Sequence, residues 1–175
     1  MHSKKRSPTK KIRKNKANSK RPHGALSRRK PTLRIFTKAA KTPRLLVVDN
    51  EIDVCNFVKS FFELRGFKVT TALNGQEGLD RLDKDKPDIV LLDIMMRTER
   101  EGLDFLPRYK EALPSARVLM ITGVEDSAMI ESAKACGADD YITKPLVLEY
   151  LENTVLNKVK QLGRKELDGR GHTNL

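Results

Sequence analysis

Residues 89–93, Ile-Val-Leu-Leu-Asp, decide the fold class of this chain. Four consecutive apolar residues followed by a polar one are typical of a short strand that is buried on both faces. Similar runs occur at 45–48, at 118–121 and, more briefly, at 141–142, and residues 67–72 alternate as an edge strand does. The sequence therefore predicts five strands, most of them covered on both sides.

Helical patterns separate these runs. Apolar residues recur at helical spacing in segments 51–65, 75–85, 102–112, 126–136 and 147–161, and Gly66 and Gly137 follow two of them as capping residues. Strands that alternate with helices form a parallel sheet, because right-handed crossovers place helices on both of its faces. We therefore predict an α/β fold with a five-stranded, doubly wound parallel sheet. Ligands of such sheets bind beyond the carboxyl ends of the strands.

Charge divides the chain into a basic arm and an acidic body. The 175 residues include 35 Lys and Arg against 23 Asp and Glu, for a formal net charge of +12. Residues 1–44 hold 17 of the bases and no acid, so the remainder carries a net charge of −5. A segment with so few apolar residues cannot offset its conformational entropy by burial. We expect 1–43 to be a disordered arm, 44–162 to be the folded domain and 163–175 to be a polar tail.

Composition excludes several classes of protein. No run of about 18 apolar residues occurs, so we expect no membrane-spanning helix. The N-terminus lacks the apolar core of a signal peptide, which favours a cytoplasmic location. Cys55 and Cys136 lie in separate apolar stretches without a C-x-x-C motif, and we interpret both as buried small side chains.

Polar residues end the predicted strands. Asp49 and Asn50 follow the first strand, Asp93 ends the third, Thr122 ends the fourth and Lys144 follows the fifth. Carboxylates suit Mg²⁺, and a carboxylate can itself accept a phosphoryl group whose charge an ammonium neutralises. Each residue alone is more simply interpreted as a helix cap or a strand-end residue. Together at one edge of one sheet, they favour a phosphoryl-transfer site.

Four separated motifs in this order resemble the receiver domain of bacterial two-component response regulators. They are Leu45–Asp49, Pro87–Met96, Met120–Gly123 and Gly137–Pro145, and the resemblance covers about residues 43–162. It implies a flavodoxin-like sheet with strand order 2-1-3-4-5. It also implies a single-domain response regulator that accepts a phosphoryl group from a sensor histidine kinase or a phosphotransfer protein. The signal would then pass to a downstream partner protein.

The resemblance assigns a role to each motif residue. Asp93 is the implied phosphoacceptor, and the implied Mg²⁺ ligands are Asp49, Asn50, Asp93 and the main-chain carbonyl of Met95. Thr122 and Lys144 would contact the phosphoryl group, Thr122 and Tyr141 would act as the switch, and the bond before Pro145 would be cis. Such a protein is not an enzyme toward other substrates, although it assists its own phosphorylation and dephosphorylation.

Two departures from the family pattern lie beside the predicted site. Asn50 stands where the family usually has a second acid, so Mg²⁺ binding should be weaker unless Glu51 compensates. Arg97 stands where the family usually has proline, and the loop after Asp93 is one residue longer. These departures keep open a receiver that binds its partners without being phosphorylated.

The basic arm supports a further alternative. In that interpretation the protein is a nucleic-acid-binding regulator that acts through residues 1–43, and the receiver is a regulatory or degenerate scaffold. The arm could equally serve an acidic partner or contact the acidic body. A solvated tail without a specific role and a start codon placed too early are the remaining interpretations.

Overall fold

The computed structural model describes residues 41–123 and 127–168, with side chains as far as residue 163. Its elements in chain order are β1 (Arg44–Val48), α1 (Ile52–Glu63), β2 (Lys68–Ala72), α2 (Gly75–Asp85), β3 (Ile89–Asp93), α3 (Glu101–Ala112), β4 (Arg117–Thr122), α4 (Ser127–Ala135), β5 (Asp140–Thr143) and α5 (Leu148–Asp168). All strand pairs are parallel, in the order β2-β1-β3-β4-β5. This order and the α/β class confirm the predicted fold.

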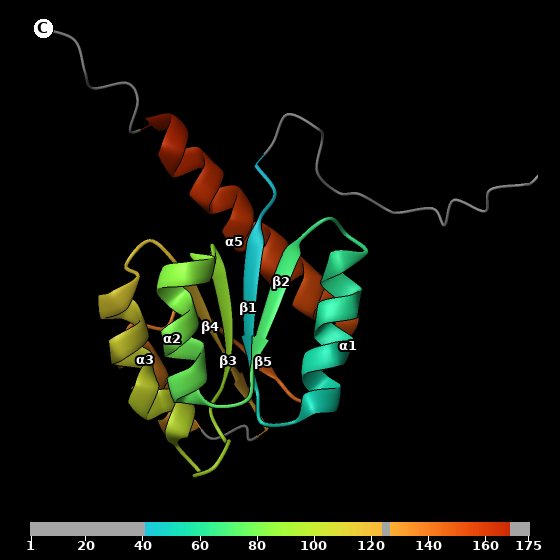
Figure 1. The fold of residues 1–175 in the computed structure, drawn as a ribbon. Coiled ribbons are helices and arrows are strands. Elements are labelled where there is room, and N and C mark those ends of the chain that lie inside the picture. The colour runs from blue at the N-terminus through green and yellow to red at the C-terminus, as the bar shows by residue number, and fades with distance from the viewer. Residues whose placement is uncertain (1–40, 124–126, 169–175) are drawn as a thin grey trace, which may run out of the picture. The chain divides into compact units, whose positions relative to one another are not determined.

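The sheet lies between two layers of helices (Figure 1). Residues of α1 and α5 pack on one face, and residues of α2, α3 and α4 pack on the other. Successive residues of the central strands serve opposite faces: Leu45 and Val47 join the first cluster, whereas Leu46 and Val48 join the second. This alternation explains why the central strands are continuous apolar runs in the sequence.

The edge strand β2 was predicted from its alternating pattern, and the structure confirms its position at the edge of the sheet. Lys68 is exposed at its start, whereas Val69 and Ala72 are buried. Gly66 and Gly137 follow α1 and α4 with φ angles of 91° and 93°, a left-handed conformation that glycine adopts without strain. Both glycines therefore have the capping conformation that the sequence indicated.

Two side chains in the helical layers differ from the predictions. Ile52 belongs to the apolar pattern of segment 51–65, which predicts a buried helix face, but it is 52% exposed because it opens α1 just beyond the end of β1. Cys136 was expected to be buried but is exposed, because it follows the last residue of α4. Cys55 is buried as predicted, and burial raises the pKa of its thiol to about 11.

The ends of the described chain extend the predicted domain slightly. Helix α5 continues to Asp168, beyond the boundary expected at residue 162. At the other end, the Pro43 carbonyl accepts a hydrogen bond of 2.9 Å from the Lys68 amide. Residues 1–40 and 169–175 lie outside the described residues, so the predicted disorder of the arm stays a prediction. Within the described ranges, no helix is long and apolar enough to cross a membrane.

Helix α3 holds the start of α2 closely, and this contact positions one side of the candidate site. The Tyr109 hydroxyl donates a hydrogen bond of 2.9 Å to the carbonyl of Gly75. A Cβ at Gly78 would overlap the Tyr109 hydroxyl and lie 2.8 Å from a methyl of Val48. Glycine at 78 is therefore required by the close approach of α2 to α3 and β1.

Candidate functional site

The carboxyl ends of the central strands bring the predicted site residues to one edge of the sheet. Asp93 is the last residue of β3 and pairs in register with Ile121, one residue before Thr122. Thr122 pairs with Thr143, which directly precedes Lys144. Asp49 follows β1, and its amide donates a hydrogen bond of 3.1 Å to the Ala72 carbonyl. The strand order thus joins residues that are far apart in sequence.

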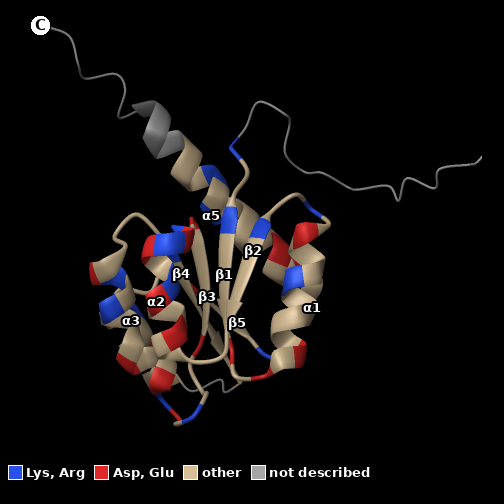
Figure 2. Cartoon of the chain, viewed as in Figure 1, with Lys and Arg blue, Asp and Glu red and all other residues tan. Residues whose placement is uncertain are grey.

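Lys144 lies at the centre of a carboxylate cluster. Its Nζ is 2.8 Å from Asp93 Oδ2, 3.0 Å from Asp49 Oδ2 and 3.2 Å from Glu51 Oε1. Asp49 is fully buried and Asp93 is 2% exposed, whereas Glu51 is exposed. Figure 2 marks acidic residues, in red, in the loops at this end of the sheet. One ammonium therefore compensates two buried carboxylates and one exposed carboxylate.

The main chain fixes both buried carboxylates in the same way. Asp49 Oδ1 accepts a hydrogen bond of 2.8 Å from the Glu51 amide, and Asp93 Oδ1 accepts one of 3.2 Å from the Met95 amide. Aspartate side chains commonly bond to the backbone two residues on, where a strand passes into a turn. In each case the other carboxylate oxygen, Oδ2, contacts the Lys144 ammonium.

The main chain also positions Lys144. Its amide donates a hydrogen bond of 2.7 Å to the Thr122 carbonyl. The Lys144–Pro145 peptide bond is cis, as the family resemblance implied.

Burial and neighbouring charges shift the pKa values of Asp93 and Lys144. Burial is the largest effect on Asp93 and raises the pKa of its carboxyl, and the charge of Asp49 raises it further, against the hydrogen bond from Lys144. Burial alone would lower the pKa of Lys144, but the interactions with Asp93 and Asp49 raise that pKa above its ordinary value. Lys144 therefore stays charged at neutral pH.

The oxygen atoms of the cluster fit a hard cation. Asp49 Oδ2 is buried, and although it lies near the Lys144 ammonium it accepts no hydrogen bond within the described part of the chain. Two carboxylates and a nearby main-chain carbonyl at Met95 are a ligand set that suits Mg²⁺. Among the described residues, no three His, Cys, Asp or Glu side chains form a ready-made metal centre. A bound ion would therefore also need water ligands.

Three other predicted site residues lie outside this carboxylate–ammonium cluster. Asn50 is exposed, whereas its neighbour Asp49 is buried. Thr122 is fully buried at the end of β4. Tyr141 is half-buried, packs against the core on the α2–α4 side, and has the Lys134 Nζ 5.4 Å from its ring centroid. The structure thus brings Asp49, Asp93 and Lys144 into direct contact.

Comparison with known proteins agrees with this arrangement. The model of the response regulator receiver domain matches residues 45–156. The chain belongs to this family. Receiver domains are phosphoacceptors of two-component phosphorelay signalling, and they generally bind Mg²⁺ for phosphorylation.

Curated relatives of this receiver domain include regulators of different lengths. The transcriptional regulatory protein TrcR of Mycobacterium tuberculosis is 37% identical over 134 residues, which are 76% of this chain and 51% of TrcR. The chemotaxis protein CheY of Listeria monocytogenes is 38% identical over 114 residues, which are 62% of this chain and 95% of CheY. The chain spans about half the length of TrcR and of CrdR from Helicobacter pylori.

Solved structures share the fold of this receiver domain. A CheY-like receiver domain protein from Methanospirillum hungatei aligns with a TM-score of 0.67 at 25% identity, covering 71% of this chain and 99% of that one. The BeF3-activated receiver domain of DrrB aligns with a TM-score of 0.61 at 27% identity, covering 69% and 99% of the two chains.

Sequence reasoning missed a second ion pair beside the receiver site. Glu101 is 4% exposed, and its carboxylate accepts hydrogen bonds from the Arg97 guanidinium at 2.7 Å, the Arg97 amide at 2.9 Å and the Gly75 amide at 3.1 Å. Glu101 therefore ties the loop after Asp93 to the start of α2. An acid in the first turn of a helix is ordinarily interpreted as a solvated group near the positive end of the dipole.

Glycine completes the attachment of this loop. The Gly102 amide donates a hydrogen bond of 3.0 Å to the Ile94 carbonyl. A Cβ at Gly102 would overlap the main-chain oxygen of Asp93. The start of α3 is thus held against the end of β3, and residues 95–100 form the loop between them. An acid four residues after Arg97, directly before this glycine, was the available sequence signal.

Replacing Glu101 by glutamine is expected to destabilise the fold by about 1–2 kcal/mol at neutral pH, because charge-assisted hydrogen bonds to two amides and a guanidinium are weakened. The pKa of Glu101 is lowered, chiefly by its hydrogen bond with Arg97. A depressed pKa contributes stability that is present above the unfolded-state value of about 4.3 and is lost as the pH falls below it. The stability difference between wild type and E101Q should therefore shrink in acid.

Urea unfolding of the two proteins at neutral and acidic pH measures this difference. Glu99→Gln is the matched control, because Glu99 is exposed in the same loop. Equal midpoints for wild type, E101Q and E99Q at neutral pH would show that the Arg97–Glu101 pair does not hold the loop.

Proposed function

We propose that this chain is a single-domain response regulator that accepts a phosphoryl group on Asp93. The donor would be the phosphohistidine of a sensor histidine kinase or of a phosphotransfer protein in the cytoplasm. The observation that carries the proposal is the convergence of Asp93, Asp49 and Lys144 within 3.0 Å contacts at the carboxyl edge of the sheet.

The proposed reaction is an in-line phosphoryl transfer. A carboxylate oxygen of Asp93 forms the new P–O bond while the P–N bond of the phosphohistidine breaks, and the imidazole leaves with the bonding electron pair. Mg²⁺, held by Asp49, Asp93 and the Met95 carbonyl, would supply positive charge to the phosphoryl oxygens. Lys144, released from its pair with the free carboxylate of Asp93, donates to one phosphoryl oxygen, and the Thr122 hydroxyl donates to another.

The output would be a shift between two states of the surface formed by α4, β5 and α5. Thr122 ends β4, and its register partner Thr143 lies two residues after Tyr141 in the neighbouring strand β5. A movement of Thr122 toward the phosphoryl group would therefore act on the strand that holds Tyr141. A ligand or modification shifts such an equilibrium only through contacts that differ between the states. We infer that a partner protein reads this surface.

Mass spectrometry tests the proposal directly. The chain is incubated with acetyl phosphate and Mg²⁺, and the intact mass and the peptide that contains Asp93 are measured. The expected result is one added phosphoryl group on that peptide, and no added group when EDTA replaces Mg²⁺ during the incubation. An unchanged mass would instead favour a receiver that acts without phosphorylation.

Asn50→Asp is expected to tighten Mg²⁺ binding by about tenfold, equivalent to about 1.4 kcal/mol, because it adds a second negative charge beside Asp49. Calorimetric titration with Mg²⁺ measures the affinity without requiring phosphorylation. Asn56→Asp, on the exposed side of α1, is the control for an added charge elsewhere. Equal affinities in all three proteins would show that position 50 lies outside the metal site.

A further inference from the structure

A buried thiol lies next to the candidate site and takes no part in the chemistry proposed for it. Cys55 is fully buried in α1, in the core cluster between the sheet and helices α1 and α5. Its thiol donates a hydrogen bond of 3.4 Å to the carbonyl of Asp49, and Sγ lies 3.8 Å from the carbonyl oxygen of Ala72. Asp49 follows β1, and Ala72 ends β2. The thiol therefore joins α1 to the carboxyl ends of two strands.

Three hydrogen bonds form a closed ring through the turn between β1 and α1. Asp49 Oδ1 accepts a hydrogen bond of 2.8 Å from the Glu51 amide. The Glu51 carbonyl accepts one of 3.1 Å from the Cys55 amide, and the Cys55 thiol donates back to the Asp49 carbonyl. Each of the three residues is thus held by two hydrogen bonds of the ring. Because a shift of one residue strains the other two bonds, the turn is fixed as a unit.

This ring takes the place of a side-chain cap at the start of α1. Glu51 occupies the N-cap position, but its side chain makes no capping hydrogen bond. The Glu51 carboxylate lies instead 3.2 Å from the Lys144 ammonium. An N-cap side chain ordinarily accepts from backbone amides of the first turn and so fixes where the helix begins. Here the Asp49 carboxylate and the Cys55 thiol fix the start of α1 relative to β1.

The ring also decides which oxygen of Asp49 a cation can reach. Oδ1 is engaged by the Glu51 amide, whereas Oδ2 is buried and accepts no hydrogen bond within the described part of the chain. Oδ2 lies 3.0 Å from the Lys144 ammonium, so it already faces a positive charge. Because Oδ1 is fixed, a rotation of the turn displaces Oδ2. The direction of Oδ2 thus depends on the contact between Cys55 and the main chain of Asp49.

We propose that Cys55 is a positioning residue that holds Asp49 in the orientation that binds a divalent cation. The inference rests on the proposed function, in which Asp49 is a ligand of Mg²⁺. Replacing a group that contacts a metal ligand rather than the metal typically changes metal affinity by about 10–100-fold. The S–H group is a weak donor, so the effect of Cys55 should lie at the lower end of that range.

A purely space-filling role would not require a hydrogen-bond donor at position 55. A thiol in apolar surroundings keeps its proton, so the S–H group of Cys55 is available to donate at neutral pH. A buried carbonyl that loses its donor pays a desolvation penalty unless its surroundings move. Alanine and valine remove the donor with a smaller and a larger side chain, whereas serine keeps a donor. These three substitutions therefore separate hydrogen bonding from packing.

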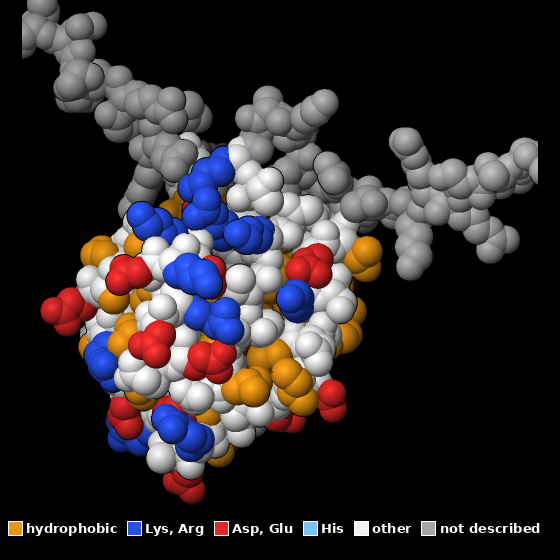
Figure 3. Space-filling model, viewed as in Figure 1, with side chains coloured by type: hydrophobic (Ala, Val, Ile, Leu, Met, Phe, Trp, Pro, Cys, Tyr) orange, Lys and Arg blue, Asp and Glu red, His pale blue; other side chains and the backbone are white. Residues whose placement is uncertain are grey.

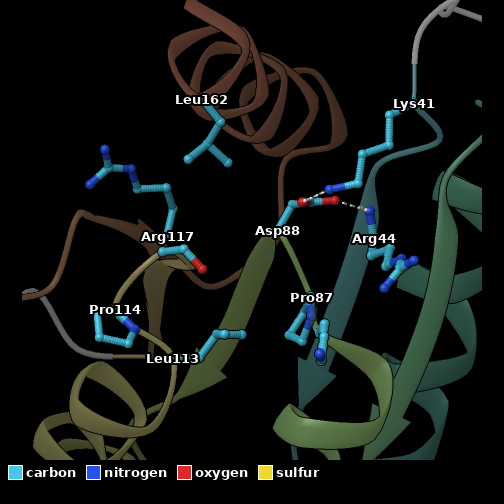
Figure 4. A pocket seen from close by; sticks show the side chains of 10 residues that line it. Lys41, Arg44, Pro87, Asp88, Leu113, Pro114, Arg117 and Leu162 are labelled. Atoms are coloured by element: carbon cyan, nitrogen blue, oxygen red, sulfur yellow. Dashed lines mark hydrogen bonds and ion pairs between the residues drawn. The ribbon is translucent and has the colours of Figure 1, made fainter. Parts of the chain in front are cut away.

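The opposite edge of the sheet does not compete for the cation. A cavity of about 520 Å³ opens there, lined by Lys41, Arg44, Lys86 and Arg117 together with one acid, Asp88 (Figure 4). Asp88 is engaged, since it accepts hydrogen bonds from the Lys41 ammonium at 3.1 Å and the Arg44 amide at 2.8 Å. Figure 3 shows Lys and Arg gathered on the surface near this end of the sheet. Because cations outnumber acids in the cavity, it repels Mg²⁺, and a titration with Mg²⁺ does not report on it.

Calorimetric titration of the full-length chain with Mg²⁺ tests the inference. C55A and C55V should both bind Mg²⁺ about tenfold more weakly than wild type, whereas C55S should bind within about twofold of wild type. Circular dichroism establishes that each variant is folded before it is titrated. Two donor-free variants of different size preserve the comparison if one of them does not fold.

Val58→Ala is the matched control. Val58 is fully buried in the same helix and the same core cluster, three residues beyond Cys55. V58A should lower the urea midpoint and leave the Mg²⁺ affinity unchanged. Equal Mg²⁺ affinities of wild type, C55A and C55V would overturn the inference alone, as would a loss in V58A or C55S equal to that in C55A. A wild type that binds no Mg²⁺ would overturn the proposed metal site, and the inference with it.

Discussion

Asparagine in place of Asp93 is expected to abolish phosphorylation of the chain by acetyl phosphate and Mg²⁺. The amide has no negative charge to carry into the new bond, and it donates where the carboxylate accepts from Lys144 at 2.8 Å. Intact mass should show one phosphoryl group on wild type and none on D93N.

Asp53→Asn is the matched control for this loss. Asp53 is exposed in the first turn of α1 at the same edge of the sheet, so its removal changes the charge near the site without touching the cluster. D53N should be labelled as wild type is. Labelling of D93N to the same extent would remove Asp93 from the proposed role.

Asp93→Asn should leave the fold at least as stable as that of the wild type. Burial and the negative charge of Asp49 raise the pKa of Asp93, so the ionised carboxylate is held at a cost in folding free energy. Removal of one of two like charges relieves that cost while Lys144 keeps its contacts with Asp49 and Glu51. A D93N protein that is folded but unlabelled would thus separate chemistry from stability.

Strand ends could be predicted from the sequence because parallel strands share one carboxyl edge. The apolar runs indicated where β1, β3 and β4 end. The polar residues that follow these runs lie close together because the strands are neighbours in the sheet. Asp49, Asp93 and Lys144 were predicted together for this reason, and they are in contact. Strand order itself came from the family resemblance, since hydrophobic patterns do not specify which strands are neighbours.

Features that depend on burial at loops and helix ends could not be predicted. Glu101 is buried where Arg97 folds back onto it and donates from both its amide and its guanidinium. Cys136 is exposed because its helix ends one residue earlier. The pairing of Arg44 with Lys68 is likewise hidden in the sequence, because it follows from strand register rather than from spacing along the chain.

Replacing Lys144 by methionine is expected to slow phosphorylation by about 10²–10³-fold, the usual loss when one group that stabilises transition-state charge is removed. It should also destabilise the fold by about 2–4 kcal/mol at neutral pH, because removing one partner leaves buried charge uncompensated. Asp49 and Asp93 would remain without the ammonium that contacts both, and Asp93, whose pKa burial already raises, would then take up a proton. Lys59→Met, at an exposed pair with Glu63, is the control.

Combining K144M with D93N identifies the source of the stability that K144M loses. If the cost of K144M comes from repulsion between the carboxylates, K144M/D93N should recover much of the stability, because only Asp49 then remains buried and charged. Acid should have the same effect, since protonated carboxylates no longer need the ammonium, so the difference between wild type and K144M should shrink as the pH falls. Urea midpoints of the four proteins across pH measure both effects. If the stability changes of K144M and D93N simply add in the double variant and do not vary with pH, Lys144 does not hold the two carboxylates together.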